Sequence, residues 1–234
     1  MINPFRIILD YIFPRRCICC NTPIYSEAFC CEECERFLPF PENACPICGK
    51  EICICGKQHF YFTAVAAAFN YELGAENAIK EFKFHERISY VKPLAVYLYE
   101  RLIQTDFVER IDLIIPAPMT KKDVNRRGYN QSELLAKELS RMSEIPVCCN
   151  LLVKVKQTHK QHHLNQAGRQ KNLTGAFRVT DSSAIRGKTV LLCDDVYTTG
   201  STFNELSQTL LENGAAEIFC LAVASTQKDE AKMQ

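Results

Sequence analysis

VLLCDDVYTTGST, residues 190–202, joins an apolar strand to a helix through two acids and a loop of small polar residues. A helix that begins after this loop offers unpaired backbone amides and the positive end of its dipole, and both attract a phosphate. Adjacent carboxylates repel a phosphate, so Asp194 and Asp195 suit ribose hydroxyls and a bound cation instead. The polar and turn residues of the loop are Thr198, Thr199, Gly200, Ser201 and Thr202. The stretch therefore predicts a phosphate-binding loop, against the alternative of a plain strand–turn–helix whose acids only cap.

Strands and helices alternate on both sides of this stretch. Four segments are apolar along their length, which is typical of strands buried on both faces of a parallel sheet. These are residues 62–71, 112–118, 188–195 and 217–225. Helices are expected at residues 74–84, 89–104, 132–142 and 201–214. The alternation predicts an α/β domain with a mostly parallel sheet.

Ten of the 14 cysteines lie between residues 17 and 55. Two cysteines three positions apart on a tight turn aim both thiolates at one ion, and a following glycine supplies the left-handed turn, as in CPICG at 45–49. Eight thiolates suit two tetrahedral zinc ions. The predicted ligands are Cys17, Cys20, Cys31 and Cys34 for one ion, and Cys45, Cys48, Cys53 and Cys55 for the other. A four-cysteine site is coordinatively closed, so its predicted role is structural.

The ligand set has alternatives within the same segment. Cys19 and Cys30 are also available, His59 can replace a cysteine, and four of the ten cysteines can hold an iron–sulfur cluster instead. We predict an N-terminal helix plus a double zinc-ribbon-like module over residues 1–58 and the α/β domain over 59–234. Because the core of the α/β domain is expected to be separate from the module, Cys45→Ser is predicted to unfold the module and to spare the α/β domain.

The composition is that of an ordinary globular protein, with 47% hydrophobic and 24% charged residues over 234 positions. It excludes wholesale disorder, collagen-like repeats and coiled coil. The N-terminal apolar run is interrupted by Arg6 and Asp10, and no apolar stretch is long enough to span a membrane. Clustered cysteines without a secretory signal predict a reducing compartment, the cytoplasm.

Charge is distributed unevenly although the net charge is only +1. Residues 121–178 carry 12 basic and 4 acidic side chains, a net charge of +8. Residues 61–120 carry 6 basic and 8 acidic side chains, and residues 179–234 carry 4 and 8. We call residues 121–178 the basic belt, and an anionic ligand is expected there.

Residues 190–202 resemble the phosphoribosyl-diphosphate (PRPP) motif of type I phosphoribosyltransferases, which has an apolar strand, two acids and a T-T-G-x-T loop. Pro116-Ala117-Pro118, RRGYNQ at 126–131 and Q-x-x-L-x-x-x-x-R-x-x-N-L-x-x-A-F at 161–177 extend the likeness. With the cysteine module, nearly the whole chain resembles the ComF family of competence-associated phosphoribosyltransferase-like proteins. Tyr197 departs from that family's usual small aliphatic residue, and His85 stands where a glycine is frequent.

The resemblance implies a role for each matched residue. Asp194 and Asp195 would contact the ribose hydroxyls and orient a Mg²⁺ complex of PRPP, while the loop would hold the 5′-phosphate. Pro116 and Ala117 would lie at the pyrophosphate. The cationic candidates for phosphate contacts are Lys83, Arg126, Arg127 and Arg169, with an exposed helix lysine as the alternative for the first. His159, His162 and His163 are expected to be solvated loop residues.

Three functions agree with these features. The first is an enzyme that transfers phosphoribosyl from PRPP to an unidentified acceptor and releases pyrophosphate. The second is a DNA-uptake adaptor that contacts single-stranded DNA or competence-machinery proteins, as the resemblance implies, although the basic belt has few aromatic neighbours for base stacking. The third is a PRPP-sensing regulator without turnover.

Overall fold

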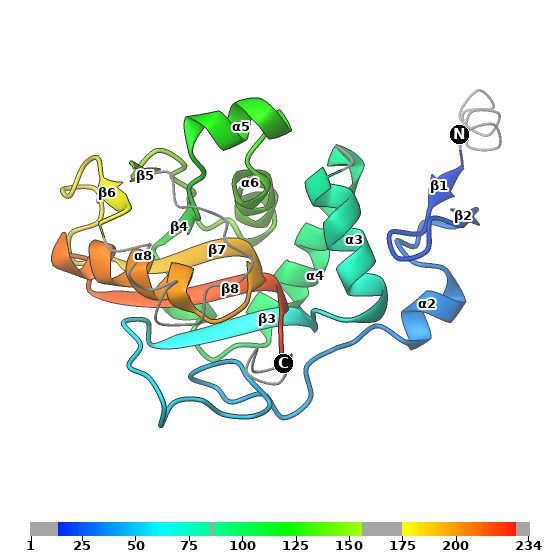
Figure 1. Ribbon diagram of the computed structural model, residues 1–234, viewed down its shortest axis with the longest axis horizontal. Coiled ribbons are helices and arrows are strands. Elements are labelled where there is room, and N and C mark those ends of the chain that lie inside the picture. Colours follow the sequence, from blue (N-terminus) through cyan, green and yellow to red (C-terminus); the bar gives the residue numbers. More distant parts are fainter. Residues whose placement is uncertain (1–13, 85–86, 156–174, 228–234) are drawn as a thin grey trace, which may run out of the picture.

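The computed structural model describes residues 14–84, 87–155 and 175–227 (Figure 1). Its centre is a parallel four-stranded sheet with the strand order β3-β8-β7-β4. The strands are β3 (Ala64–Asn70), β4 (Leu113–Pro116), β7 (Thr189–Tyr197) and β8 (Glu217–Ser225). Cys193 of β7 pairs with Pro116 of β4, so both strands end at the same edge of the sheet. The predicted α/β domain with a parallel sheet is confirmed.

Helices cover both faces of this sheet (Figure 1). Leu191 and Cys193 of β7 pack in one hydrophobic cluster with the helices α3 (Leu73–Phe84), α4 (Val91–Ile103) and α6 (Gln131–Ser143). Val190 and Leu192 alternate with them and pack in a second cluster with α8 (Ser201–Glu212). Because both faces of β7 are buried, its sequence is apolar from Val190 to Cys193, up to the two acids.

Several short elements connect these layers. The helices are η1 (Ile88–Tyr90), η2 (Val108–Arg110) and α5 (Lys121–Arg127). An antiparallel pair is formed by β5 (Leu152–Lys154) and β6 (Phe177–Val179). Except for η1, which lies at the start of the helix predicted over residues 89–104, these elements were not expected from the apolar periodicity of the sequence, because each is too short to show a period.

The cysteine module consists of the strands β1 (Arg15–Arg16) and β2 (Pro23–Ile24), the short helix α2 (Glu32–Arg36) and irregular segments (Figure 1). Ile18, Cys19 and Ile24 lie in the same hydrophobic cluster as α3 and α4. Gly74 at the start of α3 makes room for this contact, since a Cβ there would lie 2.8 Å from the Cys19 sulfur. The expectation that the α/β domain has a separate core is therefore wrong, because the first ribbon supplies part of that core.

Two further predictions concern the N-terminal helix and membrane-spanning segments. The predicted N-terminal helix lies outside the described residues. Within the described ranges, no helix is both long and apolar enough to cross a lipid bilayer.

Candidate functional site

The two acids lie at the carboxyl end of β7, beneath side chains from two helices. An oxygen of Asp195 is 2.8 Å from the Lys83 ammonium of α3. An oxygen of Asp194 accepts hydrogen bonds from the Ser132 hydroxyl of α6 at 2.7 Å and from the Asp195 amide at 2.8 Å. Asp195 is only 8% exposed. Side chains of α3 and α6 thus cover the acids at the end of this strand.

This environment penalises the ionised form of Asp194. Burial is the main reason that the pKa of Asp194 rises to about 6, and the neighbouring Asp195 charge adds to the rise. The Ser132 hydrogen bond and the Lys83 charge oppose it. The pair therefore places Asp195 against the Lys83 ammonium and Asp194 in surroundings that favour its protonated form.

Lys83 is held at the acids by its surroundings. The Tyr129 hydroxyl donates a 2.6 Å hydrogen bond to the Phe82 carbonyl, and the two rings stack at 5.8 Å between centroids. These contacts fix the last turn of α3. The Lys83 side chain is 19% exposed, so the alternative of a solvated helix lysine is wrong.

The loop after β7 turns at a left-handed glycine immediately before α8 begins. Gly200 has a φ of +82° and precedes the first residue of α8. A Cβ on Gly200 would lie 3.1 Å from the Tyr197 ring, which forms the floor of the loop. The Thr199 and Ser201 hydroxyls are 2.9 Å apart, while Thr198 and Thr202 are exposed. The predicted loop residues thus lie together at the start of α8.

Pro116 and Ala117 lie beside the acids, at the end of β4. The Ala117 amide donates to the Cys193 carbonyl at 2.8 Å, so this amide belongs to the sheet ladder. The Ala117 carbonyl accepts from the Asn130 side chain at 3.0 Å. Asn130 also caps α6 by accepting from the Ser132 amide, and it thereby positions Ser132 against Asp194.

The structure places the candidate arginines on a helix. Arg126 and Arg127 form the end of α5, which stops at Gly128 with a φ of +82°, so both directly precede the turn that leads to α6. Arg126 is 2.8 Å from Asp123, and Arg127 donates to the Gln131 side chain at 3.2 Å. Arg169 and the three histidines of the belt lie outside the described residues, as do residues 156–174 of the belt itself.

The cysteines form two compact groups of four thiols, Cys17, Cys20, Cys31 and Cys34 in one and Cys45, Cys48, Cys53 and Cys55 in the other. Within each group all sulfurs lie within 4.8 Å of one another. The sulfurs of Cys20 and Cys31 are 3.7 Å apart, and those of Cys45 and Cys55 are 3.8 Å apart. Zn–S bonds of about 2.3 Å give a tetrahedron with edges of about 3.8 Å. Both groups therefore fit structural zinc, while Cys17 with Cys19 and Cys30 forms a third, buried group.

Three side chains near the site were missed by the sequence reasoning. Ser132 follows a helix cap and gave no catalytic signal. Lys154 of β5 has a pKa lowered by burial, which the charges of Asp123 and Asp194 oppose. Lys50 is only 5% exposed, and its ammonium donates to the Thr198 carbonyl at 2.7 Å. Only the three-dimensional fold brings these residues to the acids and the loop.

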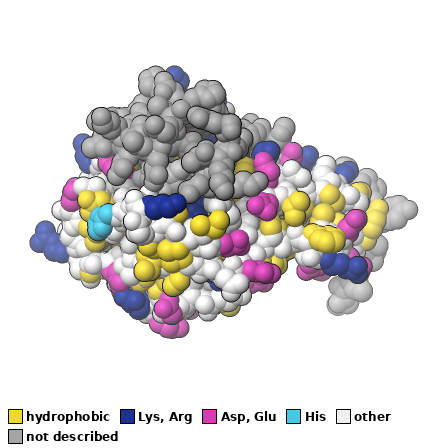
Figure 2. All heavy atoms as spheres, turned by 60° about the horizontal axis from the view of Figure 1, so that its bottom comes forward, with side chains coloured by type: hydrophobic (Ala, Val, Ile, Leu, Met, Phe, Trp, Pro, Cys, Tyr) yellow, Lys and Arg dark blue, Asp and Glu magenta, His cyan; other side chains and the backbone are white. Residues whose placement is uncertain are grey.

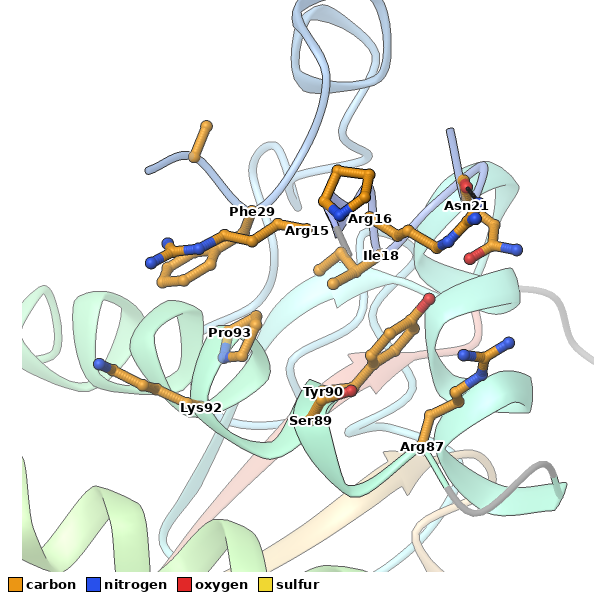
Figure 3. A pocket seen from close by; sticks show the side chains of 12 residues that line it. Arg15, Arg16, Ile18, Asn21, Phe29, Arg87, Ser89, Tyr90, Lys92 and Pro93 are labelled. Atoms are coloured by element: carbon orange, nitrogen blue, oxygen red, sulfur yellow. Dashed lines mark hydrogen bonds between the residues drawn. The ribbon is translucent and has the colours of Figure 1, made fainter. Parts of the chain in front are cut away.

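A hollow of about 530 Å³ lies between the first ribbon and the start of α4 (Figure 3). Four cationic side chains surround it, namely Arg15, Arg16, Arg87 and Lys92. Its apolar lining includes Ile18, Phe29, Tyr90 and Pro93. By contrast, the described surface in Figure 2 intersperses cationic, acidic and apolar side chains. Two of these cations are paired, Arg15 with Glu27 and Arg87 with Glu81, so the hollow combines two paired and two further cationic groups with aromatic side chains, an arrangement that the sequence did not reveal.

Family comparisons agree with both parts of the chain. Residues 124–234 match the Phosphoribosyl transferase domain, and residues 8–62 match the Double zinc ribbon domain. The parallel sheet with two acids and a small-residue loop, together with the cysteine groups, defines a phosphoribosyltransferase-type α/β protein with an N-terminal double zinc ribbon and structural zinc.

Similar proteins identify the family within this class. Competence protein F of Haemophilus influenzae is 33% identical, over 88% of this chain and 95% of its own. The DNA utilization protein YhgH of Escherichia coli K12 is 29% identical, over 89% and 96%. The chain belongs to the ComF family of competence proteins. Glutamine PRPP amidotransferase from B. subtilis, solved with ADP and GMP, overlaps with a TM-score of 0.41 at 18% identity, covering 62% of this chain and 30% of that one.

Proposed function

We propose that the carboxyl edge of the sheet binds PRPP and transfers its phosphoribosyl group to an acceptor, with release of pyrophosphate. The observation that carries this proposal is the juxtaposition of the two acids with the Gly200 loop at the end of one strand. The loop amides and hydroxyls suit the 5′-phosphate, and the carboxylates suit the ribose hydroxyls. Relatives named a competence protein and a DNA utilization protein support a role in DNA uptake, which we place in the cytoplasm.

The donor set at the acids fits Mg²⁺, because carboxylate oxygens are the ligands that this ion prefers. When bound with PRPP, Mg²⁺ would neutralise charge on the leaving pyrophosphate. Asp194 and Asp195 would hold it together with the ribose. The Lys83 ammonium lies beside Asp195, where its positive charge would stabilise a phosphate oxygen of bound PRPP.

Turnover is tested by pyrophosphate release from labelled PRPP with a panel of acceptors. Transfer predicts labelled product that is absent in the Asp194→Ala/Asp195→Ala variant. Tight PRPP binding without product from any acceptor favours the sensing regulator instead.

A second candidate function, binding of single-stranded DNA, rests on the hollow beside the first ribbon. Cationic groups around aromatic rings suit phosphates and stacked bases. Arg16→Ala should weaken binding of an oligothymidylate and reduce the dependence of log K on log salt by about 0.7, the value for one lost phosphate contact.

The basic belt is tested separately. Arg127→Ala should weaken PRPP binding by about 1.5–3 kcal/mol and weaken DNA binding less. If Arg127→Ala abolishes DNA binding and spares PRPP, the basic belt is the nucleic-acid surface.

A further inference from the structure

The second ribbon is docked on the sheet through the knuckle that contains Cys45 and Cys48. The Val65 amide of β3 donates to the Ile47 carbonyl at 3.1 Å. Gly49 has a φ of +61°, and a Cβ there would lie 2.9 Å from the Val65 carbonyl oxygen. The knuckle is therefore pressed against β3, and its next residue, Lys50, enters the protein interior.

The Lys50 ammonium joins the ends of the two central strands. It donates to the Thr198 carbonyl at 2.7 Å, to the Ser225 hydroxyl at 3.2 Å and to the Thr226 carbonyl. It also lies 4.4 Å from the centroid of the Tyr197 ring. Thr198 is the first residue of the loop at residues 198–202, which we call the phosphate loop. Ser225 is the last residue of β8, and Thr226 follows it. One side chain of the zinc ribbon thus holds the base of the loop.

Tyr197 links this ammonium to the turn of the loop. Its ring contacts Lys50 and also lies 3.1 Å from the position of a Cβ on Gly200. The Tyr197 ring is 2% exposed and stacks on Phe203 of α8 at 5.8 Å. A second contact supports the loop, because the side-chain amide of Gln58 donates to the Thr199 carbonyl at 3.4 Å.

We propose that Lys50 is a positioning residue of the phosphate loop, and that the metal state of the second cysteine group controls the order of the loop through it. A zinc ion bound by four thiolates fixes the backbone on either side of the knuckle. The Lys50 carbonyl accepts from the Cys45 amide at 2.9 Å, so the residue is held by the same turn as the ligands. Without the metal this turn loses its constraint, and the buried ammonium no longer holds the Thr198 carbonyl.

The charge of Lys50 bears on the ligand as well as on the loop. Its ammonium lies 2.7 Å from the Thr198 carbonyl, so its positive charge favours an anion bound in the loop. The inference on affinity rests on the proposed PRPP function, whereas the inference on loop order does not.

The test compares Lys50→Met with Lys188→Met in the full-length, zinc-loaded protein. Lys188 is exposed and precedes the opposite end of β7, so its variant removes the same charge away from the loop. Hydrogen–deuterium exchange of residues 197–204 without ligand reports the order of the loop. Faster exchange is expected in Lys50→Met only, with the zinc content of both variants unchanged. Wild-type exchange in Lys50→Met would overturn the proposal.

Affinity and metal dependence are measured on the same proteins. Calorimetric titration with Mg²⁺ and PRPP should show at least tenfold weaker binding for Lys50→Met and less than a twofold change for Lys188→Met. Absence of binding in the wild type would refute the PRPP function and leave the exchange test in force. Zinc removal should speed loop exchange in the wild type and add little in Lys50→Met; an equal effect in both would show that zinc does not act through Lys50.

Ser225→Ala decides the matter if Lys50→Met fails to fold or loses zinc. It removes one acceptor of the ammonium and leaves the ribbon untouched. Loop exchange should rise in the same direction with full zinc content. Unchanged exchange in a zinc-loaded Ser225→Ala protein would contradict the proposed link.

Discussion

At the scale of single residues, the ionisation of Asp194 affects the stability of the folded protein. Burial is the main reason that the pKa of its carboxyl group rises to about 6. An acid with a raised folded-state pKa adds stability below its unfolded pKa, near 4, and loses that contribution as the pH rises through 6. The ionised Asp194 therefore costs the folded protein free energy at neutral pH.

Asp194→Asn should raise the free energy of unfolding at pH 7.5, by at most about 3 kcal/mol for a shift of this size. The amide oxygen can still accept from Ser132 and from the Asp195 amide. The gain should shrink as the pH falls from 6 to 4, as followed by urea unfolding. Asp181→Asn is the control, because Ser183 hydrogen bonds lower the pKa of Asp181, and this variant should not stabilise. A pH-independent effect of Asp194→Asn would contradict this account.

Lys83→Met should lower the free energy of unfolding by about 2–4 kcal/mol, because it leaves the mostly buried Asp195 without its ion pair. Lys80→Met, one turn earlier on α3, breaks only the exposed pair with Glu76 and should leave the stability nearly unchanged. Chemical denaturation at neutral pH measures both. Equal effects of the two variants would show that Lys83 behaves as a solvated lysine.

At the scale of elements, the long apolar strands could be predicted from sequence and the short connections could not. β8 has the predicted bounds of 217–225, since a buried parallel strand is apolar on both faces. α5 has no apolar face, and only its Thr120 cap and Gly128 mark it. In the site, the loop and acids were local in sequence. The contacts of Ser132 and Lys50 with them span 62 and 148 positions, which no local pattern encodes.

Gly200→Ala tests the turn between β7 and α8. A left-handed conformation costs a residue with a Cβ about 1–2 kcal/mol, and the contact with Tyr197 adds to this. Gly187→Ala is the matched control, because its φ is +70° and a Cβ there meets no atom within 4 Å. Denaturation should therefore show a larger loss of stability for Gly200→Ala. If the two variants lose the same stability, the loop does not rest on the Tyr197 ring.

At the scale of the whole molecule, the zinc ribbons are part of the folded unit. The first ribbon shares a core with α3 and α4. The second ribbon contacts the loop after β7, where the Lys50 ammonium donates to the Thr198 carbonyl. The division into residues 1–58 and 59–234 stays a prediction about sequence segments. Because the core is shared, loss of the first ribbon should weaken the α/β domain as well.

Ile18→Ala should lower the free energy of global unfolding by about 2–4 kcal/mol, since Ile18 is 4% exposed within the shared core. Ile52→Ala, in the second ribbon and 72% exposed, should change it by less than about 0.5 kcal/mol. Unfolding should be followed by a probe within the α/β domain, such as exchange in β8. Unchanged β8 stability in Ile18→Ala would mean that the module folds separately.

The central claim is that the acids and the loop form a PRPP site. Isothermal titration calorimetry with Mg²⁺ and PRPP, on wild-type protein and on Asp194→Ala/Asp195→Ala, tests it most directly. We expect saturable binding to the wild type and none to the double variant, with both proteins folded and loaded with zinc. Equal binding by the two proteins, or none by the zinc-loaded wild type, would contradict it.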